Sequence, residues 1–138
     1  ARTMLDALLL LKDVDAPTRA DGLVMRSAFR DKPEDRIKDL DEAATLDPSD
    51  PQPLRLRAAT KLGMNKPEEA VKDFDAALKL EPDHAATHEA RGLALAAQKK
   101  WDEAKESLTK AADLVPRSPA AVLQRGRVNM LAGNVKAA

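Results

Sequence analysis

The sequence predicts an all-α fold built from repeated helix-turn-helix units. Aromatic residues make up only 2% of the 138 residues, so the core must consist of small and aliphatic side chains, which suit closely packed helices better than a sheet. Residues 32–48 align with residues 66–82 without gaps, and Pro48, Pro82 and Pro116 recur every 34 residues. A helical hairpin of this length cannot bury its own apolar face, so it needs neighbouring copies.

The 34-residue period divides the chain into three full units and a truncated one. The units are residues 17–50, 51–84, 85–118 and 119–138. Between the first two units the identical pairs are Lys32/Lys66, Pro33/Pro67, Glu34/Glu68, Lys38/Lys72, Asp39/Asp73, Asp41/Asp75, Ala43/Ala77, Leu46/Leu80 and Pro48/Pro82. So many matches at one fixed spacing indicate internal repetition.

Helix-start signals fall at the same places in each unit. Asp50 precedes Pro51, and Ser118 precedes Pro119, which predicts a capping side chain followed by proline at the first helical position. Pro33 and Pro67 are expected to begin the second helix of their hairpins. Acidic residues follow both of these prolines, and they favour the positive end of the helix dipole.

The unit at residues 85–118 shows the hairpin pattern most clearly. Two apolar stripes at helical spacing are separated by the polar residues 98–100, and Pro116 ends the second stripe. Gly92, Ala104 and Ala111 are expected where the two helices approach closely. Residues 1–16 fit less well, and we interpret them either as the second helix of a preceding, partial repeat or as a capping helix.

These features resemble the tetratricopeptide repeat (TPR) family, whose units are 34-residue helical hairpins. The family's small, bulky and proline positions are matched by Ala58, Gly92, Gly126, Ala70, Ala104, Ala138, Leu40, Phe74, Leu108, Ala43, Ala77, Ala111, Pro48, Pro82 and Pro116. Arg36 departs from the pattern, because it stands where the family has a small residue. The resemblance implies a right-handed superhelical solenoid of antiparallel hairpins.

The resemblance also implies a concave groove lined by the first helix of each unit. The predicted partner-binding residues are Met25, Phe29, Arg55, Leu62, Glu89, Leu93 and Arg127. We expect a non-enzymatic scaffold that binds a peptide or helix segment of another protein there. Alternatively, these side chains only pack helix against helix, and the repeats serve as a spacer, as a module for end-to-end self-association, or as a regulatory segment of a larger enzyme.

One binding mode of the family is not expected in this chain. Family members that grip the carboxylate end of chaperone tails place Lys, Asn and Arg at set groove positions. The corresponding positions hold Arg55, Ala59, Ala90, Ala120 and Gln124 in one frame, and Asp21, Met25, Leu56, Ala86 and Ala90 in the other. Neither set forms a clamp.

Three other groups of residues have competing interpretations. Arg57, Arg91 and Arg125 recur once per unit, either as a track for an anionic partner or, as we favour, paired with carboxylates of adjacent helices. His84 and His88 have the spacing of two metal ligands but lack a third, so we interpret them as solvated or capping residues. Asp39, Asp41, Asp73 and Asp75 are expected on a solvated face beside Lys38 and Lys72. We therefore predict no catalytic residue, no metal and no cofactor.

Composition bounds the remaining function classes. Lys plus Arg and Asp plus Glu number 23 each, without the basic excess that nucleic-acid binding usually requires. There is no Cys, and the longest apolar run, residues 7–11, is far shorter than the ~18 residues of a membrane span. We expect neither nucleic-acid binding nor membrane insertion, and the compartment stays undetermined. Because the sequence starts at Ala1 and stops within a repeat, we interpret it as a fragment.

Overall fold

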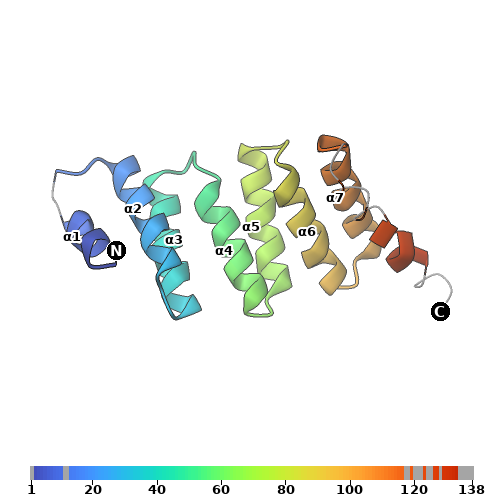
Figure 1. Cartoon of the computed structure of the whole chain (residues 1–138), viewed down its shortest axis with the longest axis horizontal. Helices are drawn as coiled ribbons and strands as arrows, with labels where there is room; N and C mark the ends of the chain where they lie inside the picture. Colours follow the sequence, from blue (N-terminus) through green and yellow to red (C-terminus); the bar gives the residue numbers. More distant parts are fainter. Residues whose placement is uncertain are drawn as a thin grey trace.

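A computed structural model describes residues 2–10, 13–116, 119, 123, 126, 127 and 129–133 of the chain (Figure 1). Its helices are α1 (Arg2–Leu10), α2 (Ala16–Ala28), α3 (Pro33–Leu46), α4 (Gln52–Gly63), α5 (Pro67–Leu80), α6 (Ala85–Ala97) and α7 (Trp101–Leu114). Residues 129–133 are also helical, and the described residues contain no strand. The prediction of an all-α repeat array is confirmed.

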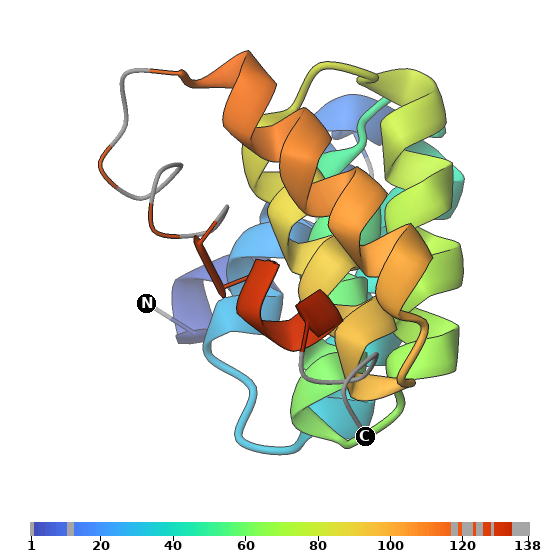
Figure 2. The same ribbon diagram turned by 90° about the vertical axis from the view of Figure 1, so that its right-hand side faces the viewer.

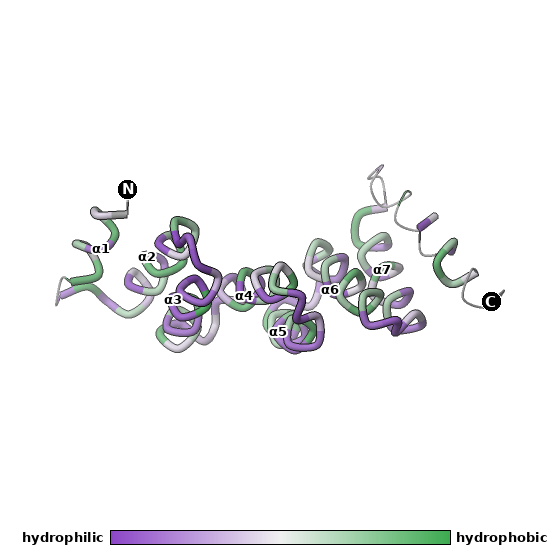
Figure 3. Tube along the Cα trace, turned by 90° about the horizontal axis from the view of Figure 1, so that it is seen from below, coloured by the Kyte–Doolittle hydropathy of each residue, from purple (hydrophilic) through white to green (hydrophobic). Residues whose placement is uncertain are grey.

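The helices pack in consecutive pairs. The hairpins are α2–α3, α4–α5 and α6–α7, and α3 contacts α4 as α5 contacts α6, so each pair rests on the next. Viewed from the end of the row, the helices stand one behind another, with α7 in front of α6 (Figure 2). From below, the row bends into an arc, with α2, α4 and α6 toward the inner side and α3 and α5 toward the outer side (Figure 3).

Prolines and side-chain caps set the helix starts. Pro33 and Pro67 are the first residues of α3 and α5, as the sequence predicts. At α4 the helix begins one residue later than expected, at Gln52, because Pro51 is the capping residue and the Asp50 carboxylate accepts a hydrogen bond from the Gln52 N–H (2.8 Å). The starts of α2 and α6 also have side-chain acceptors, since the Thr18 N–H donates to the Asp15 carboxylate (3.2 Å) and the Thr87 N–H donates to His84 Nδ1 (3.1 Å).

Tight turns close the second and third hairpins in the same way. Asn65 and Lys99, 34 residues apart, both adopt left-handed backbone angles, with φ of 59° and 61°. The Lys66 N–H donates to the Lys61 carbonyl (2.9 Å) and the Lys100 N–H donates to the Leu95 carbonyl (3.0 Å). This pattern is the Schellman motif, which satisfies carbonyls at the end of a helix.

The core between the helices is made of small and aliphatic side chains. One buried cluster contains Ala58, Ala70, Phe74 and Ala94, and another contains Ala20, Leu23 and Ala43. Gly92, Ala104 and Ala111 are all buried, and α6 approaches α7 closely at Gly92, next to Ala104. A Cβ atom added to Gly92 would lie 2.5 Å from Leu108 Cγ and 3.1 Å from the Ala104 carbonyl oxygen. Only glycine fits at this crossing without movement of α7.

We predict that Gly92→Ala lowers the free energy of unfolding by about 1–3 kcal/mol, because the new methyl group forces Leu108 and α7 to shift. Urea denaturation followed by circular dichroism measures the change. Gly63→Ala is the matched control, because an added Cβ meets nothing within 4 Å there, and it should be neutral or stabilise by up to about 1 kcal/mol. Equal effects of the two substitutions would contradict the close approach.

Candidate partner-binding groove

The inner helices carry most of the large apolar side chains that stay exposed between α2 and α7. Met25 of α2 is 58% exposed, Leu56 of α4 is 37% exposed and Leu93 of α6 is 43% exposed, while Phe29 directly after α2 is 49% exposed. On the outer helices α3, α5 and α7, all of whose residues are described, the exposed large hydrophobic residue is Leu80 at the end of α5, and Val115 directly after α7 is 45% exposed. Accessible apolar surface is therefore concentrated on α2, α4 and α6.

Two of the predicted groove residues have other contacts. Leu62 is half-buried and packs against the cluster of Ala58 and its neighbours, so it contributes mainly to the core. Arg55 is not an isolated charge, because its guanidinium pairs with the carboxylate of Glu81 at the end of α5. Leu56, which the groove prediction omitted, is exposed instead, on the same stripe of α4 as Ala59. Leu56 lies three residues before Ala59 in α4, and residues three apart share one face of a helix, so this spacing in the sequence indicates its exposure.

The remaining predicted groove residues lie further along the chain. Glu89 is half-buried on α6, and Arg127 is exposed in a helical segment after α7. Leu123, Met130 and Leu131 are exposed as well. Arg125, Ala120 and Gln124 lie outside the described residues.

Arginine side chains of the inner helices connect three helices at a time. Arg57 of α4 donates to Asp73 of α5 through Nε (2.9 Å) and Nη2 (2.6 Å), and to Asp41 of α3 through Nη1 (2.6 Å). Arg91 of α6 repeats the arrangement one unit later, with Asp75 of α5 (2.6 Å) and Ser107 of α7 as partners. For both arginines, the prediction of pairing with carboxylates of adjacent helices is confirmed.

The first unit forms a similar bridge from a different place. Arg26 of α2 donates to Asp39 of α3 (2.6 Å) and to Asp6 of α1 (3.2 Å), and Arg30 adds a second cation to Asp39 (2.8 Å). In this unit the residue 34 positions before Arg57 is the buried Leu23, so the cation comes from the next turn of the helix. We call these three arrangements the arginine bridges.

The expected solvation of Asp39 and Asp73 is wrong. Both residues are buried, at 3% and 6% exposed, whereas Asp41 is exposed and Asp75 is half-buried. Burial alone raises the pKa of the Asp73 carboxyl, but the hydrogen bonds and charges of Arg57 and Lys61 outweigh it and hold this pKa below its ordinary value.

The same balance holds at Asp39. Burial raises its pKa, and the hydrogen bonds and charges of Arg30 and Arg26 outweigh that effect, so the net shift is downward. Hydrogen bonds to Asp73 in turn raise the pKa of the Arg57 guanidinium. These carboxylates are therefore anionic at neutral pH and are occupied as structural ion pairs.

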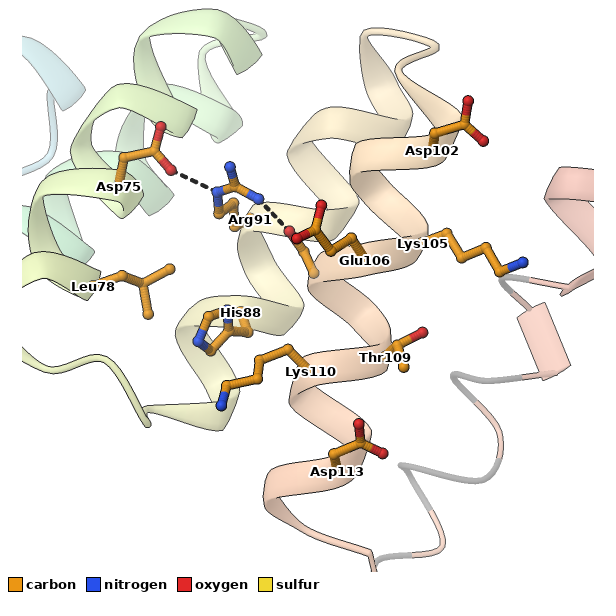
Figure 4. Close-up of a pocket in the computed structure, with 11 residues that line it drawn as sticks. Asp75, Leu78, His88, Arg91, Asp102, Lys105, Glu106, Thr109, Lys110 and Asp113 are labelled. Atoms are coloured by element: carbon orange, nitrogen blue, oxygen red, sulfur yellow. Dashed lines mark hydrogen bonds and ion pairs between the residues drawn. The ribbon is translucent and has the colours of Figure 1, made fainter.

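A charged recess lies on the outer side, between α5, α6 and α7 (Figure 4). It has a volume of about 760 Å³, and Arg91 lies between Asp75 and α7. Lys110 reaches toward His88, whereas Lys105 points to the other side of α7. Cations and carboxylates alternate around this recess, and Arg91 is already bound to both walls. It is the site of an arginine bridge rather than an apolar groove.

The two histidines act at the start of α6. The His84 Nδ1 atom accepts a hydrogen bond from the Thr87 N–H (3.1 Å), so His84 is the capping residue of α6. His88 Nε2 lies 2.7 Å from the Pro82 carbonyl oxygen. The prediction of a capping role is thus confirmed for His84. Within the described part of the chain, no group of three or more potential metal ligands occurs, and no helix is long and apolar enough to cross a membrane.

Helical hairpins stacked along an arc, with exposed apolar residues on the inner helices, define a repeat solenoid of the protein-binding class. The family model described as tetratricopeptide repeat matches residues 55–114 and 90–138, together more than half of the chain. The chain belongs to the tetratricopeptide repeat family, which confirms the resemblance seen in the sequence. Among curated proteins no sequence matches.

Solved structures with the same fold have low sequence identity to the chain. The first TPR domain of Spaghetti (RPAP3) bound to the HSP90 peptide SRMEEVD is 21% identical with a TM-score of 0.78, covering 85% of this chain and 95% of that one. MamA is 17% identical with a TM-score of 0.82, covering 96% and 77%. The Sgt2 TPR domain from Aspergillus fumigatus is 20% identical with a TM-score of 0.77, covering 86% and 82%. At these identities the likeness establishes the fold.

We predict that the free energy of unfolding falls as the pH drops below about 5, because unfolded Asp has a pKa near 3.9 and the folded pKa values of Asp39 and Asp73 are lower. Their ion pairs stabilise the fold above that range, and the stabilisation is lost as the pH falls through the lowered values. Urea denaturation at a series of pH values measures this dependence.

The variant Asp73→Asn tests the assignment. Its free energy of unfolding should be about 3 kcal/mol lower than that of the wild type at neutral pH, because Arg57 and Lys61 lose their buried partner. Its free energy of unfolding should also fall less steeply as the pH drops. Asp41→Asn removes an exposed partner of the same arginine and should cost at most about 1 kcal/mol. If both substitutions lower the free energy of unfolding equally, the buried Asp73 carboxylate does not stabilise the fold more than the exposed Asp41 carboxylate does.

Proposed function

We propose that this TPR domain is a non-catalytic recognition module that binds an extended or helical segment of another protein along its inner helices. The observation that carries the proposal is the uneven distribution of exposed apolar side chains. Met25, Leu56 and Leu93 are exposed on the inner helices, whereas among the described residues the outer helices expose Leu80, and Val115 directly after α7. A partner that presents a few apolar anchors would cover this surface.

The fate of the charged residues supports the same conclusion. The carboxylates that could serve acid–base chemistry are Asp39, Asp41, Asp73 and Asp75, and each is engaged by an arginine bridge. Asp39 and Asp73 are buried in ion pairs that lower the pKa of their carboxyl groups, and such a carboxylate is a poor proton acceptor at neutral pH. Arg57 and Arg91, in turn, have their charge compensated by carboxylates, which argues against their use as a track for an anionic partner.

A second candidate function is end-to-end self-association. Met4 and Leu10 of α1 are exposed at one end of the array, and Leu123 and Met130 are exposed at the other. Large apolar residues at both ends of one chain favour contact between the end of one copy and the start of the next.

For the groove, we predict that Leu93→Asp and Met25→Asp each weaken peptide binding at least about tenfold, with peptides selected from a displayed random library. Each substitution places a charge under the bound peptide and removes an apolar contact worth about 1–2 kcal/mol. Fluorescence anisotropy on the full chain measures the affinity, and circular dichroism checks that helicity is unchanged.

Leu80→Asp is the matched control for these two variants. Leu80 and Leu93 are equally exposed, at 43%, but Leu80 lies on an outer helix. The control should bind the selected peptides like the wild type. Loss of binding in Leu80→Asp, with Leu93→Asp unaffected, would place the binding surface on the outer face and overturn the proposal.

For self-association, we predict that the weight-average mass in sedimentation velocity rises with concentration and that Leu10→Asp reduces this rise, because the charge disrupts an apolar end. Leu80→Asp, away from both ends, should leave the rise unchanged. A mass equal to the monomer at all concentrations would exclude this second function.

A further inference from the structure

The joint between the first two hairpins differs from the joint between the second and third. Ala28 and Ala59 stand at the first joint, and the residues 34 positions later, at the second joint, are Leu62 and Leu93. The first joint thus has two small side chains where its sister joint has two large ones. Ala28 and Ala59 line a hollow of about 460 Å³ between α2 and α4, which we call the α2–α4 notch.

A charged residue stands at the same joint. Arg36 of α3 replaces the small residue found at Ala70 and Ala104 in the later units. Those alanines are buried, whereas Arg36 is only half-buried and lines the α2–α4 notch. Its Nε donates to the Ser27 carbonyl at the end of α2 (3.0 Å), which fixes the side chain across the joint.

The guanidinium of Arg36 keeps donors for a ligand. Among the described residues the structure shows no hydrogen-bond partner for its two terminal nitrogens, and no buried side-chain nitrogen or oxygen lacks a partner, so these nitrogens are accessible. The other walls of the notch include Leu56 and Met64, together with the exposed positions Ala59 and Gly63. A single cation with open donors therefore faces mostly apolar surroundings.

We propose that the α2–α4 notch binds an acidic side chain of the partner segment, with an apolar residue next to it. The inference rests on the proposed function and specifies the chemistry of its partner. A carboxylate accepts two parallel hydrogen bonds from the terminal nitrogens of a guanidinium, and it balances one positive charge. The adjacent apolar side chain fills the space that Ala28 and Ala59 leave open.

The position of the notch favours an internal acidic residue over the end of a chain. Met25 and Phe29 are exposed on the α2 side of the notch, and Leu93 is exposed beyond α4. A segment that covers both sides continues through the notch in both directions. The neighbouring acids Glu34 and Asp35 do not compete for Arg36, because residues one or two apart on a helix point in different directions.

The test uses the full chain and peptides selected on it from a displayed random library. We expect the selected peptides to share an Asp or Glu beside an apolar residue. Replacement of that acid by its amide should weaken binding to the wild type about ten- to hundredfold, because one charge-assisted pair is lost. The same replacement should have no effect on binding to Arg36→Ala. Amidation of the peptide's C-terminus should leave affinity unchanged, and an effect of amidation instead of the side-chain change would overturn the assignment.

Two variants separate the notch from the rest of the groove. Arg36→Ala restores the small residue of the sister units and should fold, which urea denaturation checks. Ala59→Leu copies Leu93 into the first joint, closes the notch and should weaken the selected peptides about tenfold or more. Lys38→Ala, an exposed cation on the same helix, is the charge control and should have no effect.

The experiments distinguish an error about the notch from an error about the whole groove as the binding surface. Selected peptides without an acidic preference, or with one that persists in Arg36→Ala, would overturn the role of the notch. If Leu93→Asp still abolished their binding, the groove would remain the binding surface. Peptides that bind Leu93→Asp and Met25→Asp as well as the wild type, or a library that yields no binder, would overturn both.

Discussion

The arginine bridges are the interaction on which the rest of the array depends. Each one joins an inner helix to the outer helix of its own hairpin and to the preceding helix, as Arg57 joins Asp73 and Asp41. Burying a carboxylate is costly unless its partners are in place, so a hairpin that slipped by one turn would leave Asp73 buried and unpaired. The bridges therefore specify which helices meet and in which register, more than they add to net stability. The apolar contacts of small residues supply the driving force.

This arrangement explains why the two faces of the solenoid differ. The charges of the outer helices and the arginines of the inner helices compensate one another within and between hairpins. What the inner helices still present to a partner is mainly apolar, at Met25, Leu56 and Leu93. An interface of this kind gains affinity from a few buried anchors, and it needs additional polar contacts for specificity. Under the proposed function, these exposed apolar residues supply affinity, and selectivity comes from the few polar groups beside them that lack a partner.

The period of 34 residues, the prolines and the small residues predicted the helices, their pairing and the crossing at Gly92, because these depend on local sequence and on the repeat frame. The burial of Asp39 and Asp73 was not predictable from spacing along one helix, since it depends on cations that reach across from the neighbouring helix. The repeat position of Leu62 predicts a groove residue, and the structure adds that Leu62 is half-buried and packs against the cluster of Ala58, Ala70, Phe74 and Ala94. Repeat position predicts the direction of a side chain, whereas the packing partners determine how much of it stays exposed.

Departures from the repeat pattern have a physical meaning in such an array. Where every unit has the same small residues, each joint closes in the same way, and no position along the groove differs from another. The first joint breaks this uniformity, because Arg36 stands in place of alanine while Ala28 and Ala59 stand in place of leucine. Small residues at Ala28 and Ala59 thus leave space in the groove wall, and the larger, charged Arg36 lies beside it. A hydrogen bond to the Ser27 carbonyl fixes the position of the Arg36 guanidinium. A uniform solenoid could bind an apolar segment in several registers one repeat apart. If the notch binds an acidic side chain as proposed, the cation at the first joint distinguishes one of these registers from the others.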